Sequence, residues 1–393
     1  MKTKHLIFTA FILALVITSC AEKGEIVSSE IMPGADRTEI YLPLLEGKNV
    51  ALAINNSSVV EETPLMDTLV SLGVNVVRVF APEHGFRGRN NYDTIDLKTG
   101  IEVKSLYGSG KYKPEPQDLT GIDVMIFDMQ DVGTRFYTYL STLHYVMEAC
   151  AENDVELILM DRPNPNDSYI DGPILDTNFR SFVGMHPIPI LHGLTLGEYA
   201  GMINGEGWLK DGIQCNVKVV EIANYHHGKE YILPIDPSPN LNTQQSILLY
   251  PSLCLFEGTV ISQGRGTMFP FQVLGNPLLA EFYEFSFTPV SIEGMSTRPP
   301  HIDKECFGLD LREYNTNIFK ESGRINLSWL IEFYNIYPDK DKFFRAAGFD
   351  LLAGGDMLRK QITEGLSPEQ IRASWEPALS NYKEMRKKYL LYQ

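Results

Sequence analysis

Residues 75–81 (NVVRVFA) place the strongest constraint on the fold of this chain. The run is largely apolar and contains three β-branched valines, which is the pattern of a strand buried in a parallel sheet. Pro82, which has no N–H for a strand ladder, ends the run, and Glu83 and His84 follow directly. Ligands of open α/β sheets bind beyond the carboxyl ends of the strands. We therefore expect Glu83 and His84 to lie in a ligand-binding crevice.

Two later apolar runs end in the same way. The segment 123–133 (DVMIFDMQDVG) turns acidic at Asp128 and Asp131, and the segment 156–165 (ELILMDRPNP) turns acidic at Asp161. Strand, helix and strand alternate here at the spacing of βαβ units. This predicts an α/β fold with a Rossmann-like parallel sheet and helices on both faces. No strand in this half is followed by Gly-x-Gly-x-x-Gly, so we expect no dinucleotide cofactor and assign no other.

The first twenty residues have the composition of a secretory signal peptide. Lys2 and Lys4 precede an apolar segment, 6–17, that is too short to span a membrane, and two small residues then precede Cys20. A cysteine in this position resembles a bacterial lipobox, which implies lipidation of Cys20. We therefore predict a protein of the cell envelope, lipid-anchored to the outer membrane and facing the periplasm or the cell surface.

Shifts in composition divide the chain into four predicted parts. They are a lipoprotein signal peptide (1–20), a tether and lead-in (21–46), a Rossmann-like catalytic domain (47–289) and a smaller C-terminal α/β domain (290–393). Within the catalytic domain, the polar loop 89–118 is long enough to be functional or to form a lid.

Charge and cysteine content exclude several classes of partner. Loss of two lysines with the signal peptide takes the basic count from 34 to 32 against 50 acids, so the mature chain carries about −18. We therefore expect no nucleic-acid binding, and membrane contact only through the lipid anchor. An anionic substrate would need arginines placed at the site. The other four cysteines are scattered without a Cys-x-x-Cys pair, which predicts buried thiols rather than a metal site.

Carboxylates, arginines and histidines gather at the predicted strand ends and in glycine-rich loops, with tyrosines and asparagines nearby. They are Glu83, His84, Asp128, Asp131, Arg135, Asp161, Arg162, His186, His192, Glu257 and Arg265. Paired carboxylates in a cleft suit glycoside hydrolysis, because one protonates the leaving oxygen and the other acts as base or nucleophile. A single acid at a strand end is more often a helix cap or the partner of an arginine. The prediction therefore rests on the group rather than on each member.

Six longer segments resemble the motifs of NamZ-type exo-β-N-acetylmuramidases. They are 81–88 (APEHGFRG), 127–137 (FDMQDVGTRFY), 161–165 (DRPNP), 237–241 (PSPNL), 255–259 (LFEGT) and 264–267 (GRGT). The likeness spans nearly the whole mature chain. It implies a glycoside hydrolase that releases terminal N-acetylmuramic acid from the non-reducing end of peptidoglycan-derived disaccharides or glycan chains. It also implies an active cleft between a Rossmann-like domain and a smaller α/β domain.

The resemblance assigns roles to individual residues. Glu83 becomes the first candidate for a catalytic carboxylate and Asp128 the second, with His84 and Glu257 as further catalytic candidates. The candidates for substrate binding are Arg135, Tyr137, Asp131, Asp161, Arg162, Asn164, His186, His192, Asn240 and Arg265. Muramic acid bears a lactyl carboxylate, which we expect an arginine such as Arg135 or Arg265 to meet.

Two other classes of function fit the same residues. A non-catalytic sugar- or muropeptide-binding lipoprotein would need hydrogen bonds and stacking aromatics, but no second carboxylate within reach of Glu83. A metal-dependent amidase would need a metal site built from scattered carboxylates and histidines, and it would be sensitive to chelators. An α/β-hydrolase is disfavoured, because the chain has no Gly-x-Ser-x-Gly elbow.

Overall fold

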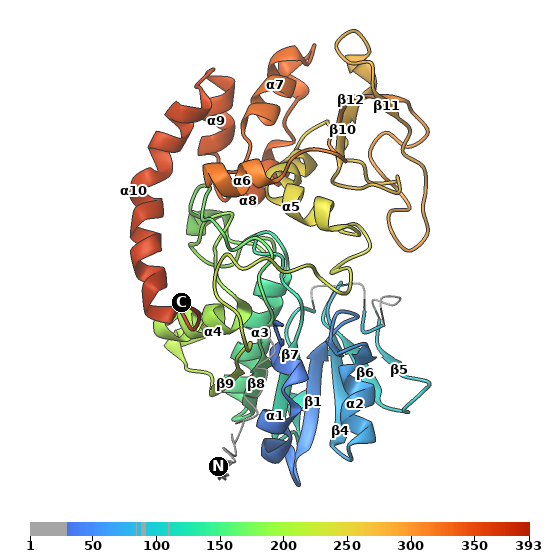
Figure 1. Cartoon of the computed structure of the whole chain (residues 1–393), viewed down its shortest axis with the longest axis vertical. Helices are drawn as coiled ribbons and strands as arrows, with labels where there is room; N and C mark the ends of the chain where they lie inside the picture. The colour runs from blue at the N-terminus through green and yellow to red at the C-terminus, as the bar shows by residue number, and fades with distance from the viewer. Residues whose placement is uncertain (1–29, 84, 88–91, 109–110) are drawn as a thin grey trace, which may run out of the picture. The chain divides into compact units, whose positions relative to one another are not determined.

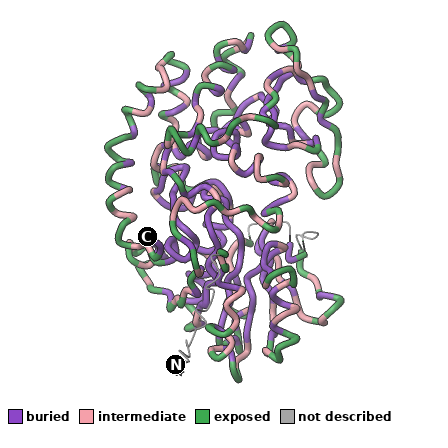
Figure 2. The backbone as a smooth tube through the Cα atoms, viewed as in Figure 1, coloured by how far each residue is buried: buried purple, intermediate pink, exposed green. Residues whose placement is uncertain are grey.

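Seven strands form a mostly parallel sheet in the order β5-β6-β4-β1-β7-β8-β9 (Figure 1). They are β1 (Asn49–Ile54), β4 (Asn75–Ala81), β5 (Thr94–Ile95), β6 (Glu102–Ser105), β7 (Val124–Asp128), β8 (Glu156–Met160) and β9 (Val217–Val220). Each pair of neighbours among these strands is parallel, apart from the antiparallel β5–β6 pair at one edge. The central strands are buried along nearly their whole length, as the apolar runs predict (Figure 2).

The computed structural model describes residues 30–83, 85–87, 92–108 and 111–393. Ile31–Gln393 pack as one unit. The predicted signal peptide with Cys20 and the catalytic candidate His84 lie outside the described residues. No helix in the described part is long and apolar enough to cross a membrane.

Helices cover both faces of the sheet, because alternate residues of each strand point to opposite sides. Val50 and Leu52 of β1 pack in one apolar cluster with α1 (Thr38–Leu45) and α2 (Leu65–Ser71). Ala51 and Ala53 pack in the other cluster, with α3 (Tyr139–Glu152) and α4 (Leu196–Gly205). The prediction of a Rossmann-like α/β sheet with helices on both faces is therefore confirmed.

The order of the strands places a topological switch point at the centre of the sheet. The chain passes from β1 through α2 to β4 on one side, and from β7 through α3 to β8 on the other. The carboxyl ends of β1 and β7 are therefore adjacent while their connections diverge. A crevice forms at such a point, and in open α/β sheets it is where ligands bind.

The rest of the chain adds small strands and further helices. A hairpin pairs β2 (Val59–Val60) with β3 (Thr63–Pro64), and a second sheet has the order β10-β12-β11 with antiparallel pairing. The bounds are β10 (Val273–Asn276), β11 (Ser286–Phe287), β12 (Cys306–Asp310), α5 (Gln244–Leu253), α6 (Asn317–Ser322), α7 (Ser328–Ile336), α8 (Ala346–Ala353), α9 (Met357–Thr363) and α10 (Pro368–Arg386). The large apolar cluster continues from α3 into α5, α7 and α8. The domain boundaries at 46/47 and 289/290 stay predictions.

Candidate active site

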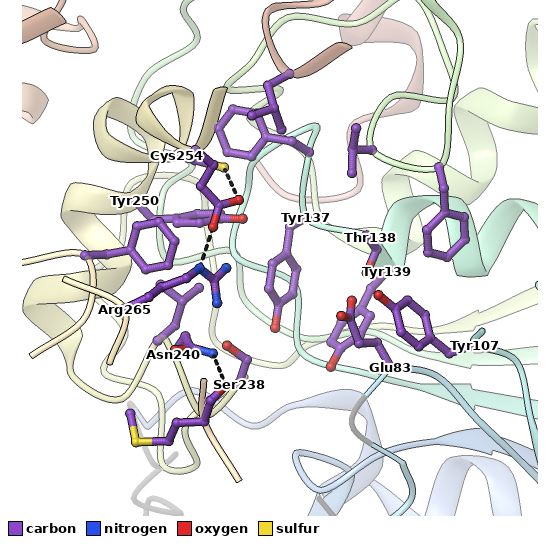
Figure 3. Close-up of a pocket in the computed structure, with 18 of the residues that line it drawn as sticks. Glu83, Tyr107, Tyr137, Thr138, Tyr139, Ser238, Asn240, Tyr250, Cys254 and Arg265 are labelled. Atoms are coloured by element: carbon purple, nitrogen blue, oxygen red, sulfur yellow. Dashed lines mark hydrogen bonds and ion pairs between the residues drawn. The ribbon is translucent and has the colours of Figure 1, made fainter. Parts of the chain in front are cut away.

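A cavity of about 500 Å³ lies beyond the carboxyl end of β4. Much of its described lining comes from four distant parts of the sequence: the turn after β4, the segment that leads into α3, the loop before α5, and the residues that follow α5. Two carboxylates, Glu83 and Glu257, line it together with one cation, Arg265. In the close-up, Tyr137 stands between Glu83 and Arg265 (Figure 3).

Glu83 is held in the turn that follows β4. The N–H of Gly85 donates to the carbonyl of Pro82 (3.0 Å), and Gly85 has a φ of 73°, which favours glycine. Glu83 lies beside Tyr107 and Tyr139 (Figure 3). Burial raises the pKa of Tyr107, and the Glu83 carboxylate, which accepts a hydrogen bond from the Tyr107 hydroxyl, raises it further. Tyr107 therefore stays protonated and can orient the Glu83 carboxyl group.

Glu257 is held by a short charged network. It lies in the 3-10 helix η5 (Cys254–Gly258), and its Oε1 is 2.6 Å from Nε of Arg265. Gln263 Nε2 donates to the same oxygen at 3.1 Å. Burial lowers the pKa of Arg265, but the neighbouring Glu257 carboxylate more than offsets this, so the pKa lies above its ordinary value. About 29% of the Arg265 side chain remains exposed to solvent, so part of its guanidinium can be reached from the cavity.

Two glycines bring Arg265 to the cavity. Gly264 and Gly266 have φ values of 83° and 84°, and a Cβ atom on Gly266 would lie 2.4 Å from Cγ of Pro299. The turn places the Arg265 guanidinium over the ring of Phe271, 5.1 Å from its centroid. Side chains at either glycine would disturb this placement, which explains why the glycine-rich motif surrounds the cation.

Asn240 supplies an unused hydrogen-bond acceptor to the cavity. Its Nδ2 donates to the carbonyl of Met295 (3.1 Å), whereas its buried Oδ1 has no hydrogen-bond partner among the described residues. Buried polar atoms in folded proteins nearly always have a hydrogen-bond partner. A hydroxyl or amide N–H of a ligand in the cavity could donate to this oxygen. Tyr137, by contrast, uses its hydroxyl to donate to the carbonyl of Pro237 (2.8 Å), so its ring forms cavity wall.

The cavity can therefore carry out acid–base chemistry on a polar, anionic ligand. Two carboxylates face one space, as glycoside hydrolysis requires. Arg265 can meet an anionic group, the Asn240 oxygen can accept a hydrogen bond, and aromatic side chains supply apolar surface.

Asp128, predicted as the second catalytic carboxylate, does not line this cavity. Its side chain is fully buried and receives two hydrogen bonds from Arg162, at 2.5 and 2.8 Å. Burial raises the pKa of Asp128, and the Arg162 guanidinium opposes that shift. Arg162 also donates to the carbonyl of Val59 (2.8 Å). The two side chains form a buried ion pair between the ends of β7 and β8, which leaves neither of them free to contact substrate.

Arg135, predicted to bind substrate, is also part of the protein interior. Only 1% of its surface is exposed, and its guanidinium donates to the backbone carbonyls of Pro173, Ile188 and Leu352. Burial lowers the pKa of Arg135 to about 9. The residue ties three distant segments together, so Arg265 is left as the arginine that faces the cavity.

The remaining predicted residues are buried framework. Asp161 accepts from the Thr195 hydroxyl (2.7 Å) and the Gly197 N–H (2.9 Å) at the start of α4, and from the Tyr392 hydroxyl (2.7 Å). Burial raises its pKa to about 7. The others lie among buried partners and do not line the cavity: Asp131 near His192, Asn164 against the Leu194 carbonyl, and His186 between Tyr199 and His144.

Several residues that line the cavity were not predicted from the sequence. Tyr107 and Tyr112 lie in the segment 89–118. This segment was predicted to be a polar loop, and that prediction is wrong in part, because its described residues include β5 and β6 of the central sheet. Phe182 and Met295 come from segments that carried no motif. The length of the polar segment 89–118 and its three tyrosines were the available signal, whereas isolated apolar residues offered none.

Comparisons with known proteins give consistent results. The family model "Exo-beta-N-acetylmuramidase NamZ, N-terminal" matches residues 50–245, and the corresponding C-terminal model matches residues 248–392. A peptidoglycan beta-N-acetylmuramidase NamZ of Bacillus subtilis (strain 168) is 37% identical over 375 residues, covering 90% of this chain and 89% of that protein.

Two crystal structures of DUF1343 family proteins from Bacteroides fragilis NCTC 9343 have the same fold. One has a TM-score of 0.87 and 46% identity, and the match covers 93% of this chain and 99% of that chain. The other has a TM-score of 0.80 and 29% identity, and covers 92% and 99% respectively.

Proposed function

This chain belongs to the NamZ family of exo-β-N-acetylmuramidases, and from that premise we propose that it releases terminal N-acetylmuramic acid from the non-reducing end of peptidoglycan fragments. As a member of this family it is a glycoside hydrolase of peptidoglycan. The observation that carries the finer proposal is that Glu83 and Glu257 line one cavity, with Arg265 as the single cation among its described lining residues. A binding protein would not need a second carboxylate in the cavity that Glu83 lines.

We assign Glu83 as the general acid. It is oriented by Tyr107 and carries no ion pair among the described contacts. In the protonated state it donates its proton to the glycosidic oxygen as the bond to the anomeric carbon breaks. The departing alcohol leaves neutral, and Glu83 is left as a carboxylate.

Glu257 is the second carboxylate in this proposal. Its carboxylate is held in place by Arg265, and it can stabilise the positive charge that develops at the anomeric carbon or activate the attacking water. The sequence favoured Asp128 for this role. Because the Asp128 carboxylate already accepts two hydrogen bonds from Arg162, we assign the role to Glu257 instead.

The direct test is hydrolysis of a para-nitrophenyl β-glycoside of N-acetylmuramic acid and of the disaccharide N-acetylmuramyl-N-acetylglucosamine, with analysis of the products. Free N-acetylmuramic acid must appear from both substrates. An enzyme that releases only internal or reducing-end fragments from longer glycans would contradict the exo-acting proposal.

Replacing Arg265 by alanine should weaken the binding of N-acetylmuramic acid by about one to two decades, and that of N-acetylglucosamine far less. A charge-assisted hydrogen bond contributes roughly 1.5–3 kcal/mol, and only muramic acid carries the lactyl carboxylate. Calorimetric titration of both sugars measures the difference. Arg265→Lys, which keeps the charge but loses the planar fork, serves as the matched variant. Equal losses on the two sugars would show that Arg265 serves Glu257 or the fold instead.

The envelope location stays a proposal, because Cys20 lies outside the described residues. It is supported by the lipobox-like end of the predicted signal peptide. Replacing Cys20 by serine should move the protein from the membrane fraction to the soluble fraction with its activity retained. A variant that still sediments with membranes would overturn the lipid anchor.

A further inference from the structure

A second, larger cavity adjoins the candidate active site. Its volume is about 820 Å³, and two of its lining residues, Tyr112 and Phe182, also line the active-site cavity. None of the residues assigned to catalysis or to the muramic acid carboxylate lines it. We call it the aromatic cavity, after Tyr112, Tyr145, Phe182 and Trp208 in its wall.

Three of these rings form a platform of nearly parallel planes. Tyr112 and Phe182 stack with centroids 4.1 Å apart and an interplanar angle of 22°. Tyr145 lies within 19° of parallel to each of them, at 6.3 and 6.4 Å. All three side chains are half-buried, so part of each ring faces solvent. Flat, amphipathic surface of this kind suits the C–H face of a pyranose ring.

The cavity also carries positive charge on a strongly acidic protein. Arg180 and Lys210 line it, are exposed, and form no ion pair with a described carboxylate. Glu148, also in the wall, is already occupied by Lys113 (2.8 Å) and by the backbone N–H of Lys210 (2.8 Å).

The wall contains two further side chains that could bear charge, His144 and Asp211. His144 stays neutral, because burial lowers its pKa to about 4. Asp211 is exposed and forms no ion pair with Arg180 or Lys210, so it adds a negative charge to the wall but leaves the Arg180 guanidinium unpaired among the described residues. The Arg180 guanidinium is fixed at one end, since its Nε donates to the carbonyl of Met185 at 2.6 Å. Its terminal nitrogens therefore remain available for an anionic group of a ligand.

We propose that the aromatic cavity binds the aglycone, the part of the peptidoglycan fragment beyond the bond that is cleaved. The inference rests on the proposed function. The terminal sugar must lie against Glu83 and Glu257, which line only the first cavity, and the glycan continues from that bond. The glycan can extend from the active-site cavity into the aromatic cavity along Tyr112 and Phe182, which line both. The next sugar packs on the aromatic platform, and a carboxylate of the following muramyl unit meets Arg180.

Three substrates that differ in their aglycone distinguish the role of the active-site cavity from that of the aromatic cavity. The para-nitrophenyl glycoside has no aglycone sugar, the disaccharide N-acetylmuramyl-N-acetylglucosamine has one, and a tetrasaccharide of two such units adds a second lactyl carboxylate. Steady-state kinetics would be measured on each for the wild type, Arg180→Ala and Tyr145→Ala. Arg324→Ala, which removes an exposed arginine that lines neither cavity, is the matched control.

Arg180→Ala should lower kcat/KM on the tetrasaccharide by about 10-fold, mainly through KM, and leave the other two substrates unchanged. Tyr145→Ala should lower kcat/KM on both oligosaccharides and spare the aryl glycoside, which also reports that the variant is folded. The inference is overturned if both variants match Arg324→Ala on every substrate, or lose activity equally on all three. A wild-type protein that cleaves none of the substrates would overturn the proposed function itself.

Discussion

Glu83→Gln should lower turnover of the natural disaccharide by about 100-fold or more while the protein stays folded and still binds ligand. The substitution preserves the shape of the side chain and removes its titratable proton. General acid–base catalysis usually contributes two to four decades, which sets the expected scale. Glutamine can still accept a hydrogen bond from Tyr107, so the turn after β4 is not disturbed. Single-turnover and steady-state rates on the disaccharide measure the effect.

The leaving group provides the internal control for this experiment. A para-nitrophenyl leaving group needs little protonation, so Glu83→Gln should lose much less activity on the aryl glycoside than on the disaccharide. Glu364→Gln, at an exposed position after α9, controls for the loss of one carboxylate. If Glu83→Gln stays near wild type on the disaccharide, Glu83 only positions the substrate and Glu257 becomes the candidate for the acid.

Replacing Arg162 by methionine should destabilise the protein by about 3–5 kcal/mol. The substitution keeps much of the side-chain volume but leaves the fully buried Asp128 carboxylate without its partner. A buried charge without a partner costs most of its desolvation free energy, or forces the group to take up a proton. Urea unfolding at neutral pH measures the loss as a shift in the midpoint.

A double variant shows whether the loss comes from the unpaired charge. Asp128→Leu combined with Arg162→Met removes both charges, and it should recover much of the stability that Arg162→Met alone loses. Residual activity per folded molecule should stay substantial in this double variant, because Asp128 does not line the cavity. A stable but inactive double variant would return Asp128 to the catalytic role that the sequence suggested.

The sequence by itself determined the central strands of the sheet and the general class of chemistry, whereas β5 and β6 lie in a segment that was predicted to be a loop. The runs that became β1, β4, β7 and β8 are rich in apolar residues and end at polar or proline-containing turns, so local pattern alone defined them. Their alternation with amphipathic segments defined the parallel α/β arrangement. The polar turn after β4 predicted that Glu83 lies in a ligand-binding crevice, and Glu83 does line the cavity.

Tertiary structure alone decided which polar strand ends face the cavity. Asp128, Asp161 and Glu83 follow strands in the same manner, but Arg162 occupies Asp128, and the start of α4 together with Tyr392 from the C-terminal end occupies Asp161. Whether a carboxylate is available depends on whether a donor from elsewhere in the chain reaches it, because a buried charge must find a partner wherever the fold supplies one. Glu257 and Arg265 line the same cavity as Glu83 because distant parts of the chain pack together. A local sequence pattern does not show which distant segments will meet.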